Sequence, residues 1–321
     1  MTIAFFDAAE VEELLDYPGC IAAVRRAMIA LSSGERPQPL RQIFPVGTDG
    51  SFGTMPGELS ALSTFGAKLV SVFKDPEKPG RTRHQGVVVA YDGQSGAVSC
   101  IADAEPITKI RTACATAVAT DALARADADV LAIFGTGLQA EAHLRALPLV
   151  RPFAKILLWG QSYDRASELA KRMSEALGQE ILSVRSAEEA AKRADVICTV
   201  TSSPKPVLLG EWVKPGTHIN LVGSSYLGPV EVDTALVAKG RYIADYRPGV
   251  LAQGAEFAVA RETGAIDDTH LVAEIGEILA GRVEGREDHH QITIYKSLGH
   301  VVQDLAAANY LRDRANPLTS S

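Results

Sequence analysis

The sequence has 321 residues, of which 46% are hydrophobic and 22% are charged, and its net charge is −7. A single hydrophobic core stops growing at about 250–300 residues, so this length predicts two domains. The acidic balance and the lack of a Lys/Arg block in the sequence argue against nucleic acid or an anionic membrane surface as a partner. No apolar run approaches the ~18 residues of a spanning helix, and the acidic N-terminus is unlike a signal peptide. We therefore expect a soluble, cytoplasmic protein.

Metal binding is not expected. The four cysteines are scattered, without the Cys/His spacing of a zinc site or the pattern of a disulfide framework: Cys20, Cys100, Cys114 and Cys198. We expect them to be small core residues.

The first ~110 residues mix helix and strand patterns. Apolar residues at helical spacing over 11–31 predict one helix that stops at Gly34. Strands are predicted over 65–73, 86–91 and 97–103. The glycine-containing turn at 92–96 predicts that the last two strands form an antiparallel hairpin. An Ala-rich helix is expected over 111–126.

From residue 130 onward, short apolar strands alternate with helices. Strands are predicted over 130–134, 156–159, 196–200, 219–222 and 242–244. The intervening helices include one running to about residue 149, one ending at Gly178 and one beginning at a capping box of Ser186 and Glu189. A last amphipathic helix is expected over 300–311. This alternation predicts a Rossmann-type, doubly wound parallel sheet with right-handed crossovers.

A glycine-rich turn joins the first strand of this series to its helix: Gly135-Thr136-Gly137-Leu138-Gln139-Ala140. The first glycine permits the tight turn, and the second lets the backbone approach a pyrophosphate. Ala140 replaces the third glycine and still allows close packing of helix and strand. The helix N-terminus adds free N–H groups. In this context the turn predicts an NAD(P) site.

The end of the second strand carries no acidic residue. NAD enzymes place Asp or Glu there to bind the ribose 2′-hydroxyl, whereas this chain has Gly160, Gln161 and Ser162, with Arg165 one turn later. Without a carboxylate there is no repulsion against a 2′-phosphate, so we expect NADP(H) to be preferred, with NAD(H) as the alternative. Asp164 lies in the same loop, where it either contacts the ribose or caps the next helix.

Three cations occupy unusual positions. Lys68 lies within an apolar strand of which both faces look buried, and Arg111 opens a helix, where the helix dipole disfavours a cation. Arg41 lies in a Pro-rich loop. Each position is explained by a bound anion, by an internal salt bridge or by a long side chain that reaches the surface.

Together these patterns resemble the ornithine cyclodeaminase/mu-crystallin family over nearly the whole chain. The resemblance rests on Arg41 and on segments at 55–57, 67–71, 107–113, 135–140, 194–197, 276–281 and 292–299. It implies that residues 113–299 form the Rossmann NAD(P)-binding domain. Residues 1–112 and 300–321 would then form a discontinuous α+β domain that binds substrate and mediates dimerisation.

The resemblance also implies roles for individual residues. Arg41, Lys68 and Arg111 are expected to converge on a substrate carboxylate beside the nicotinamide, which an Arg fork would orient for hydride transfer. Lys68 would additionally protonate or polarise the reacting group. Further substrate contacts are expected from Met55 and His300, and further cofactor contacts from Thr112, Thr201, Ser297 and Leu298.

One position departs from the family pattern. Ornithine cyclodeaminases carry a catalytic Asp after the fifth Rossmann strand, and the corresponding residue here is Ser225. A serine hydroxyl neither takes a proton near pH 7 nor stabilises an ammonium group by charge, and cyclodeamination needs both. Ser225 either hydrogen-bonds the substrate nitrogen or only satisfies backbone groups in its loop.

We therefore expect an NAD(P)H-dependent oxidoreductase that reduces a cyclic imino acid, such as pyrroline-2-carboxylate or piperideine-2-carboxylate, to the L-amino acid. A related keto or imino acid would suit the same residues. Two alternatives remain at this point: an NAD-dependent ornithine cyclodeaminase, and a non-catalytic protein that binds NADPH and a small carboxylate. The expected partners are a small amino or imino acid and a second copy of the chain.

Overall fold

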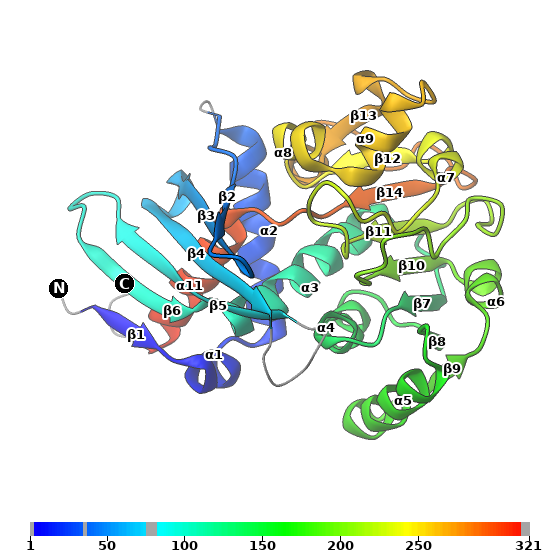
Figure 1. The fold of residues 1–321 in the computed structure, drawn as a ribbon, viewed down its shortest axis with the longest axis horizontal. Coiled ribbons are helices and arrows are strands. Elements are labelled where there is room, and N and C mark those ends of the chain that lie inside the picture. Colours follow the sequence, from blue (N-terminus) through cyan, green and yellow to red (C-terminus); the bar gives the residue numbers. More distant parts are fainter. Residues whose placement is uncertain (1–2, 35–36, 75–81, 316–321) are drawn as a thin grey trace. The chain divides into compact units, whose positions relative to one another are not determined.

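The computed structural model describes residues 3–34, 37–74 and 82–315, and the side chains of residues 82–84 are not described. The chain divides into two compact units, Met1–Thr112 with His300–Ser321, and Ala113–Gly299 (Figure 1). Each unit is described below by itself. The mixed α/β class and the parallel sheet expected from the sequence are both confirmed.

The first unit contains one six-stranded sheet in the order β1-β6-β5-β4-β3-β2. Its strands are β1 (Ala4–Phe6), β2 (Gln42–Val46), β3 (Gly50–Leu59), β4 (Thr64–Lys74), β5 (Thr82–Asp92) and β6 (Val98–Asp103). Strand β1 is parallel to β6, and the other neighbours are antiparallel, so the hairpin of β5 and β6 is confirmed. The helices are α1 (Ala8–Leu14), α2 (Tyr17–Ser33), η1 (Ser60–Leu62), the start of α3 (Ala104–Leu123) and α11 (Val301–Ala315).

The last helix of the chain is the centre of this unit. Helix α11 packs against strands β3 to β6 and against α2 (Figure 1). Nearly every side chain from Val301 to Leu311 is buried, including the polar residues Gln303, Asp304 and Asn309. A helix that is buried all round needs partners for its polar side chains, and those of α11 contribute to the candidate site described below.

Three expectations for the first unit are wrong. The helix predicted over 11–31 is two helices, because Asp16 caps the N-terminus of α2 by accepting from the Gly19 amide, and Pro18 follows it. The helix predicted from residue 111 begins at Ala104, where the Asp103 carboxylate accepts from the Glu105 amide. The strand around Lys68 is not buried on both faces: Thr64 and Lys68 are buried on one face, whereas Phe65 and Phe73 on the other are 40 and 41% exposed.

The second unit contains an eight-stranded, wholly parallel sheet in the order β13-β12-β14-β11-β10-β7-β8-β9. The strands are β7 (Val130–Phe134), β8 (Lys155–Trp159), β9 (Ile181–Val184), β10 (Val196–Thr199), β11 (His218–Leu221), β12 (Arg241–Ala244), β13 (Leu271–Glu274) and β14 (Thr293–Lys296). Between them lie α4 (Leu138–Ala146), η2 (Leu147–Leu149), α5 (Tyr163–Leu177), α6 (Ala187–Arg193), α7 (Thr234–Lys239), α8 (Arg247–Gln253), α9 (Ala255–Glu262), η3 (Asp268–His270) and α10 (Ile275–Leu279). The central strands are almost entirely buried, as expected for a parallel sheet covered on both faces.

The strand register aligns the carboxyl ends of this sheet. The last residues of all eight strands are paired in one row: Val184, Trp159, Phe134, Thr199, Leu221, Lys296, Ala244 and Glu274. The residues that follow them therefore lie along one edge. Ligands bind at this edge in open α/β sheets, so the residues just beyond the strands decide what the unit binds.

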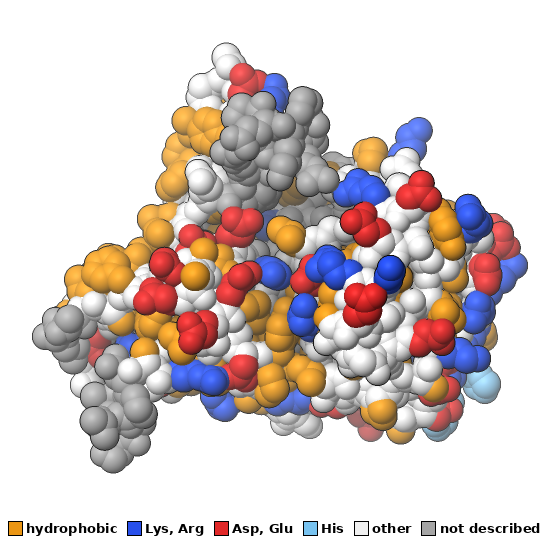
Figure 2. All heavy atoms as spheres, turned by 90° about the horizontal axis from the view of Figure 1, so that it is seen from below, with side chains coloured by type: hydrophobic (Ala, Val, Ile, Leu, Met, Phe, Trp, Pro, Cys, Tyr) orange, Lys and Arg blue, Asp and Glu red, His pale blue; other side chains and the backbone are white. Residues whose placement is uncertain are grey.

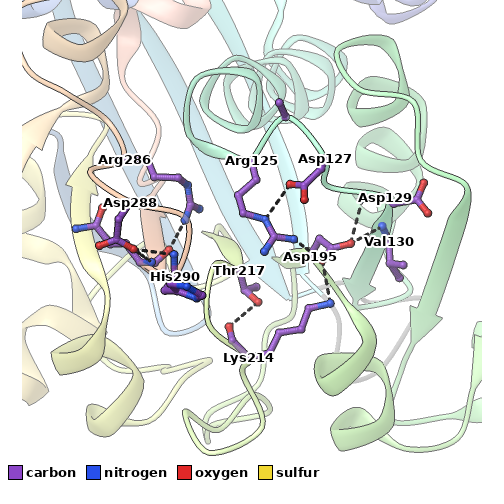
Figure 3. A network of polar contacts seen from close by, with 12 residues as sticks. Arg125, Asp127, Asp129, Val130, Asp195, Lys214, Thr217, Arg286, Asp288 and His290 are labelled. Carbon is purple, nitrogen blue, oxygen red and sulfur yellow. Dashed lines mark hydrogen bonds and ion pairs between the residues drawn. The ribbon is translucent and has the colours of Figure 1, made fainter.

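The opposite edge of the sheet is held by a network around Asp195 (Figure 3). The Asp195 carboxylate accepts 3.0 Å hydrogen bonds from the amides of Asp129 and Val130, and it pairs with Arg125 at 3.1 Å and Lys214 at 2.8 Å. Burial alone would raise the pKa of Asp195, but Lys214 and the two amides lower it below its usual value. This network fixes the start of β7 against β10 and lies at the edge away from the glycine-rich turn.

Within the described residues, no helix is long and apolar enough to cross a membrane. The same residues contain no group of three or more His, Cys, Asp or Glu side chains that could hold a metal ion. Cys20, Cys100, Cys114 and Cys198 are all buried free thiols. On the face shown in Figure 2, Lys and Arg side chains lie among Asp and Glu side chains.

Candidate functional site

The glycine-rich turn lies directly after β7. Gly135 has φ +134°, and a Cβ there would lie 2.9 Å from the Val200 carbonyl oxygen, so only glycine suits this position. Gly137 is the N-cap of α4, and a Cβ added to it would meet nothing within 4 Å. Ala140 is fully buried, which permits close packing of α4. The turn therefore combines a required glycine with open space above the N-terminus of a helix.

The end of β8 contacts this turn. A Cβ on Gly160 would lie 2.5 Å from the Thr136 side chain, so Gly160 allows the two loops to approach each other. Ser162, and not Asp164, is the N-cap of α5, and its hydroxyl accepts from the Arg165 amide at 3.4 Å. Gln161, Ser162 and Arg165 are exposed, and none of the residues from Gly160 to Ser162 is acidic. The end of β8 is therefore polar and free of acidic residues, as expected from the sequence.

A buried glutamate that the sequence analysis did not identify holds the end of β10. Glu231 is fully buried and accepts from the amide and hydroxyl of Thr201, at 2.6 and 2.8 Å, and from the Gly223 amide at 2.7 Å. Burial raises the pKa of Glu231, although the hydrogen bonds from Thr201 oppose this. Thr201 is thus held at the expected edge, with its hydroxyl already bound to protein.

The loop that contains Ser225 is anchored by a buried ion pair. Lys296, the last residue of β14, lies 2.8 Å from the Glu256 carboxylate, and both side chains are fully buried. The Lys296 ammonium also donates to the Ser224 hydroxyl at 2.6 Å, and that hydroxyl hydrogen-bonds Glu256. Burial would raise the pKa of Glu256, but Lys296 and Ser224 lower it. Ser225 follows this anchor as a half-buried residue.

A second acid, Asp245, fixes the segment after β14. Its carboxylate accepts 2.7 Å hydrogen bonds from the amides of Leu298 and Gly299. The adjacent Ser297 is 2% exposed, and its hydroxyl has no hydrogen-bond partner among the described residues. The Gln139 side-chain oxygen is likewise buried without a partner in that part of the chain. Buried polar groups are normally satisfied, so these two atoms fit a polar ligand along this edge.

A dinucleotide fits these features. The open space at Gly137, the free amides at the start of α4 and the two unpartnered polar atoms are what a pyrophosphate and its attached nucleosides require. The residues expected to hold the cofactor therefore lie at one edge of the sheet, apart from Thr112, which belongs to the first unit and is almost completely buried on α3. Their individual roles stay predictions.

In the first unit, two of the expected cations share one carboxylate. The Lys68 ammonium lies 3.1 Å from Asp304 Oδ1, and the Arg111 Nε lies 2.9 Å from the same oxygen. Arg111 also donates to Gln303 at 2.7 Å, and Lys68 to Thr108 at 3.4 Å. Lys68 and Arg111 are each 4% exposed and Asp304 is fully buried. The three side chains therefore hold one excess positive charge away from water.

The electrostatics of this cluster lower the pKa of Lys68 to about 8. Burial is the main cause, repulsion from Arg111 and Arg41 adds to it, and attraction to Asp304 opposes it. The pKa of His300 falls to about 4, mainly because of burial. At neutral pH Lys68 is therefore a cation close to its pKa, whereas His300 is neutral and cannot give a proton as an imidazolium.

The remaining expected substrate residues also belong to this unit. Met55 pairs directly with Lys68 across β3 and β4, so the two side chains share a face of the sheet. Arg41 lies in the loop expected from the sequence, immediately before β2, and it is close enough to affect the pKa of Lys68. His300 immediately precedes α11, and its Nδ1 accepts from the Val302 amide.

Arg111 does not open a helix, contrary to the prediction from the sequence. Because α3 begins at Ala104, Arg111 lies two turns inside the helix and not at its positive end. The carboxylate that partners it, Asp304, was missed by the sequence analysis. An Asp among apolar residues of a helix is a signal that could have identified it, since a buried acid needs a cationic partner.

Comparison with known proteins identifies the family of this chain. A family model described as the ornithine cyclodeaminase/mu-crystallin family matches residues 2–318. The chain belongs to this family. Among relatives, the ketimine reductase mu-crystallin of Mus musculus is 32% identical over 315 residues, which cover 97% of this chain and 96% of that protein.

Two solved structures of the same fold are also similar to this ornithine cyclodeaminase/mu-crystallin family member. The Δ1-pyrroline-2-carboxylate reductase of Thermococcus litoralis, in complex with NADH and L-proline, has a TM-score of 0.92 and 33% identity and covers 98% of this chain and 97% of its own. An archaeal alanine dehydrogenase dimer with bound NAD has a TM-score of 0.91 and 29% identity, with coverage of 98% and 96%.

Proposed function

We propose that this protein is a nicotinamide-dependent reductase that converts a cyclic imino acid of the pyrroline-2-carboxylate or piperideine-2-carboxylate type, or a related keto or imino acid, to an L-amino acid. The observation that carries the proposal is the cluster in which Lys68 and Arg111 share a single Asp304 oxygen. A buried excess positive charge is unfavourable unless an anion neutralises it, and a substrate carboxylate supplies that anion. The similar ketimine and pyrroline-2-carboxylate reductases support the same substrate class.

The residues of the cluster have distinct tasks in this proposal. Arg111 binds the substrate carboxylate through its guanidinium and so orients the C=N bond. Lys68 hydrogen-bonds the reacting nitrogen and holds the proton that the product amine gains, since its pKa of about 8 lets it give up a proton near neutral pH. Met55 and the neutral His300 line the position of the substrate ring. The bound nicotinamide supplies the hydride.

We propose that NADP(H) is the preferred cofactor and NAD(H) the alternative. The turn from Gly135 to Ala140, together with Thr201, Ser297 and Leu298, would hold the pyrophosphate and the nicotinamide nucleoside. The end of β8, from Gly160 to Ser162, carries no carboxylate that would repel a 2′-phosphate, and in the turn that follows, the charge of Asp164 is balanced by that of Arg165. The similar solved structures contain NADH or NAD, so the preference needs its own test.

Ser225 separates this proposal from ornithine cyclodeaminase activity. A serine hydroxyl cannot accept the proton of an ammonium group near pH 7, so oxidation of ornithine would lack a base at this position. Reduction of an imine asks only for a held carboxylate, a proton source and a hydride donor. In such a reductase, Ser225 would only donate or accept a hydrogen bond at the substrate nitrogen.

We also propose that the protein acts as a homodimer formed through the first unit. The strand register places Phe5, Phe44, Phe65 and Phe73 on the sheet face opposite Lys68, and these side chains are 65, 51, 40 and 41% exposed. Hydrophobic side chains are visible on the surface of this unit at the left of Figure 2. Exposed aromatic residues on one face are typical of an interface. Phe65→Glu should shift the molecular mass measured by light scattering from dimer to monomer.

The activity is tested by following NADPH and NADH absorbance with pyrroline-2-carboxylate and piperideine-2-carboxylate, beside an assay of ornithine plus NAD for proline and ammonia. Oxidation of NADPH by an imino acid, without proline from ornithine, is the expected result. Proline from ornithine without net NADH would instead support cyclodeaminase activity. Tight NADPH binding without turnover of any substrate would support a binding protein.

A further inference from the structure

Arg185 lies beside the nucleotide-binding edge of the second unit. Trp159 at the end of β8 pairs with Phe134 of β7 on one side and with Val184 of β9 on the other. Strands β7, β8 and β9 lie side by side (Figure 1). The residues that follow their ends are Gly135, Gly160 and Arg185, so these residues are neighbours along the carboxyl edge. Arg185 therefore emerges next to the strand end at which Rossmann proteins bind the ribose of the adenosine.

A tyrosine holds the Arg185 side chain in place. The guanidinium carbon lies 3.8 Å from the ring centroid of Tyr163, the first residue of α5. The Tyr163 hydroxyl in turn accepts from Ser183 on β9 at 3.4 Å. A guanidinium stacked on a ring keeps its N–H edge free for a planar or tetrahedral anion, and stacking lowers the entropy lost on binding.

The charges around this position favour an anion. Arg185 has no ion pair with a carboxylate among the described residues, whereas the exposed Arg172 and Arg193 each have one. Arg165 adds a second exposed cation in the first turn of α5. Asp164, also in that turn, contributes one negative charge, so the local balance stays positive.

We propose that Arg185, stacked on Tyr163, binds the 2′-phosphate of NADP(H), with Arg165 as a second contact. This inference rests on the nucleotide site of the proposed function and names the residue that sets its cofactor preference. Arg185 follows the third strand of the series, whereas NAD(P) enzymes usually bind the ribose 2′ position at the end of the second. The expected interaction is a bidentate, charge-assisted hydrogen bond, which is lost when the phosphate is absent.

The test measures binding of two nucleotides that lack nicotinamide, by calorimetry, so that catalysis plays no part. Adenosine 2′,5′-bisphosphate carries the 2′-phosphate, and 5′-AMP does not. Arg185→Met should weaken binding of the bisphosphate by about 10–100-fold and change 5′-AMP binding by less than about twofold. Tyr163→Phe should keep the preference, whereas Tyr163→Ala should reduce it. Arg193→Met, at the end of α6, is the matched control and should change neither affinity.

Each outcome has one meaning. If the unaltered chain binds both nucleotides equally, the NADP(H) preference itself is wrong and the role of Arg185 fails with it. If the unaltered chain prefers the bisphosphate and Arg185→Met retains that preference, the inference about Arg185 is overturned while the cofactor preference stands. Equal weakening of both nucleotides would also overturn it, because Arg185 would then support the loop and not the phosphate. Melting temperatures of all variants identify any that fail to fold.

Discussion

Asp304→Asn perturbs the buried cluster of the first unit with almost no change of shape. In the folded chain Asp304 is fully buried and gives one oxygen to both Lys68 and Arg111. Removing its charge leaves two cations that are each only 4% exposed and that have no other carboxylate partner among the described residues. Breaking a buried ion pair in this way typically costs about 3–5 kcal/mol of folding free energy.

The folding free energy lost in Asp304→Asn should depend on pH, because Lys68 titrates. Its folded pKa of about 8 lies below the unfolded value, so its protonated form opposes folding, and the stability linked to this group rises as the pH increases through 8. Because Asp304 raises the pKa of Lys68, Asp304→Asn should lower that pKa further. Each further unit corresponds to about 1.4 kcal/mol. The stability lost in the variant should therefore be larger at pH 6 than at pH 9.

Urea unfolding followed by circular dichroism at both pH values measures this difference. Asp313→Asn is the matched control, since it lies on the same helix, pairs with Arg312 and is exposed, and it should change stability by less than about 1 kcal/mol. A loss in Asp304→Asn no larger than in the control would refute the buried-charge reasoning. A large loss that does not vary with pH would refute the link to Lys68.

Three further results are expected. Lys296→Met should lower the free energy of unfolding by about 3–5 kcal/mol, because Glu256 is left buried without its cation. Adding Glu256→Gln should restore part of that stability in urea unfolding, and no recovery would contradict the ion-pair account. Gly137→Ala adds a methyl group in open space, so it should lower the free energy of unfolding by about 1 kcal/mol or less, yet weaken NADPH binding measured by calorimetry about 10-fold or more. Gly135→Ala should also lower the free energy of unfolding, by about 1–3 kcal/mol, because of the positive φ at this position. Equal NADPH binding by Gly137→Ala and the unaltered chain would argue against a pyrophosphate at this turn. Activity should fall as the pH rises through about 8, when the Lys68 ammonium loses its proton, and a profile flat to pH 10 would exclude Lys68 as the proton source.

The parallel sheet was accessible from the sequence because its signals are local. Strand β7 has the predicted bounds, since a fully buried parallel strand is a short apolar run with a glycine turn directly after it. Strands β2 and β3 were missed because Pro45, Pro56 and several glycines interrupt their alternation, and such residues predict loops. Ser186 caps α6 as predicted, but the Glu189 carboxylate pairs with Arg193 and does not complete the capping box.

The polar partners of the candidate site could not be predicted in the same way. Asp304 is 236 residues from Lys68 and 193 from Arg111, and no local pattern brings such residues together. The ion pair of Lys296 with Glu256 and the hydrogen bonds of Glu231 likewise depend on tertiary packing. The sequence analysis could therefore identify unusual cations, but only the packing of α11 against the sheet indicates which carboxylate they share.

The central claim is that the excess positive charge of Lys68 and Arg111 binds a substrate carboxylate. Calorimetry with pyrrole-2-carboxylate and pyrrole-2-carboxamide, two planar rings that differ in that charge, tests it most directly in the presence of saturating NADPH. The account predicts that the carboxylate binds at least about 10-fold more tightly than the amide and that Arg111→Met removes this difference. Equal affinities of the two compounds for the unaltered chain would contradict it.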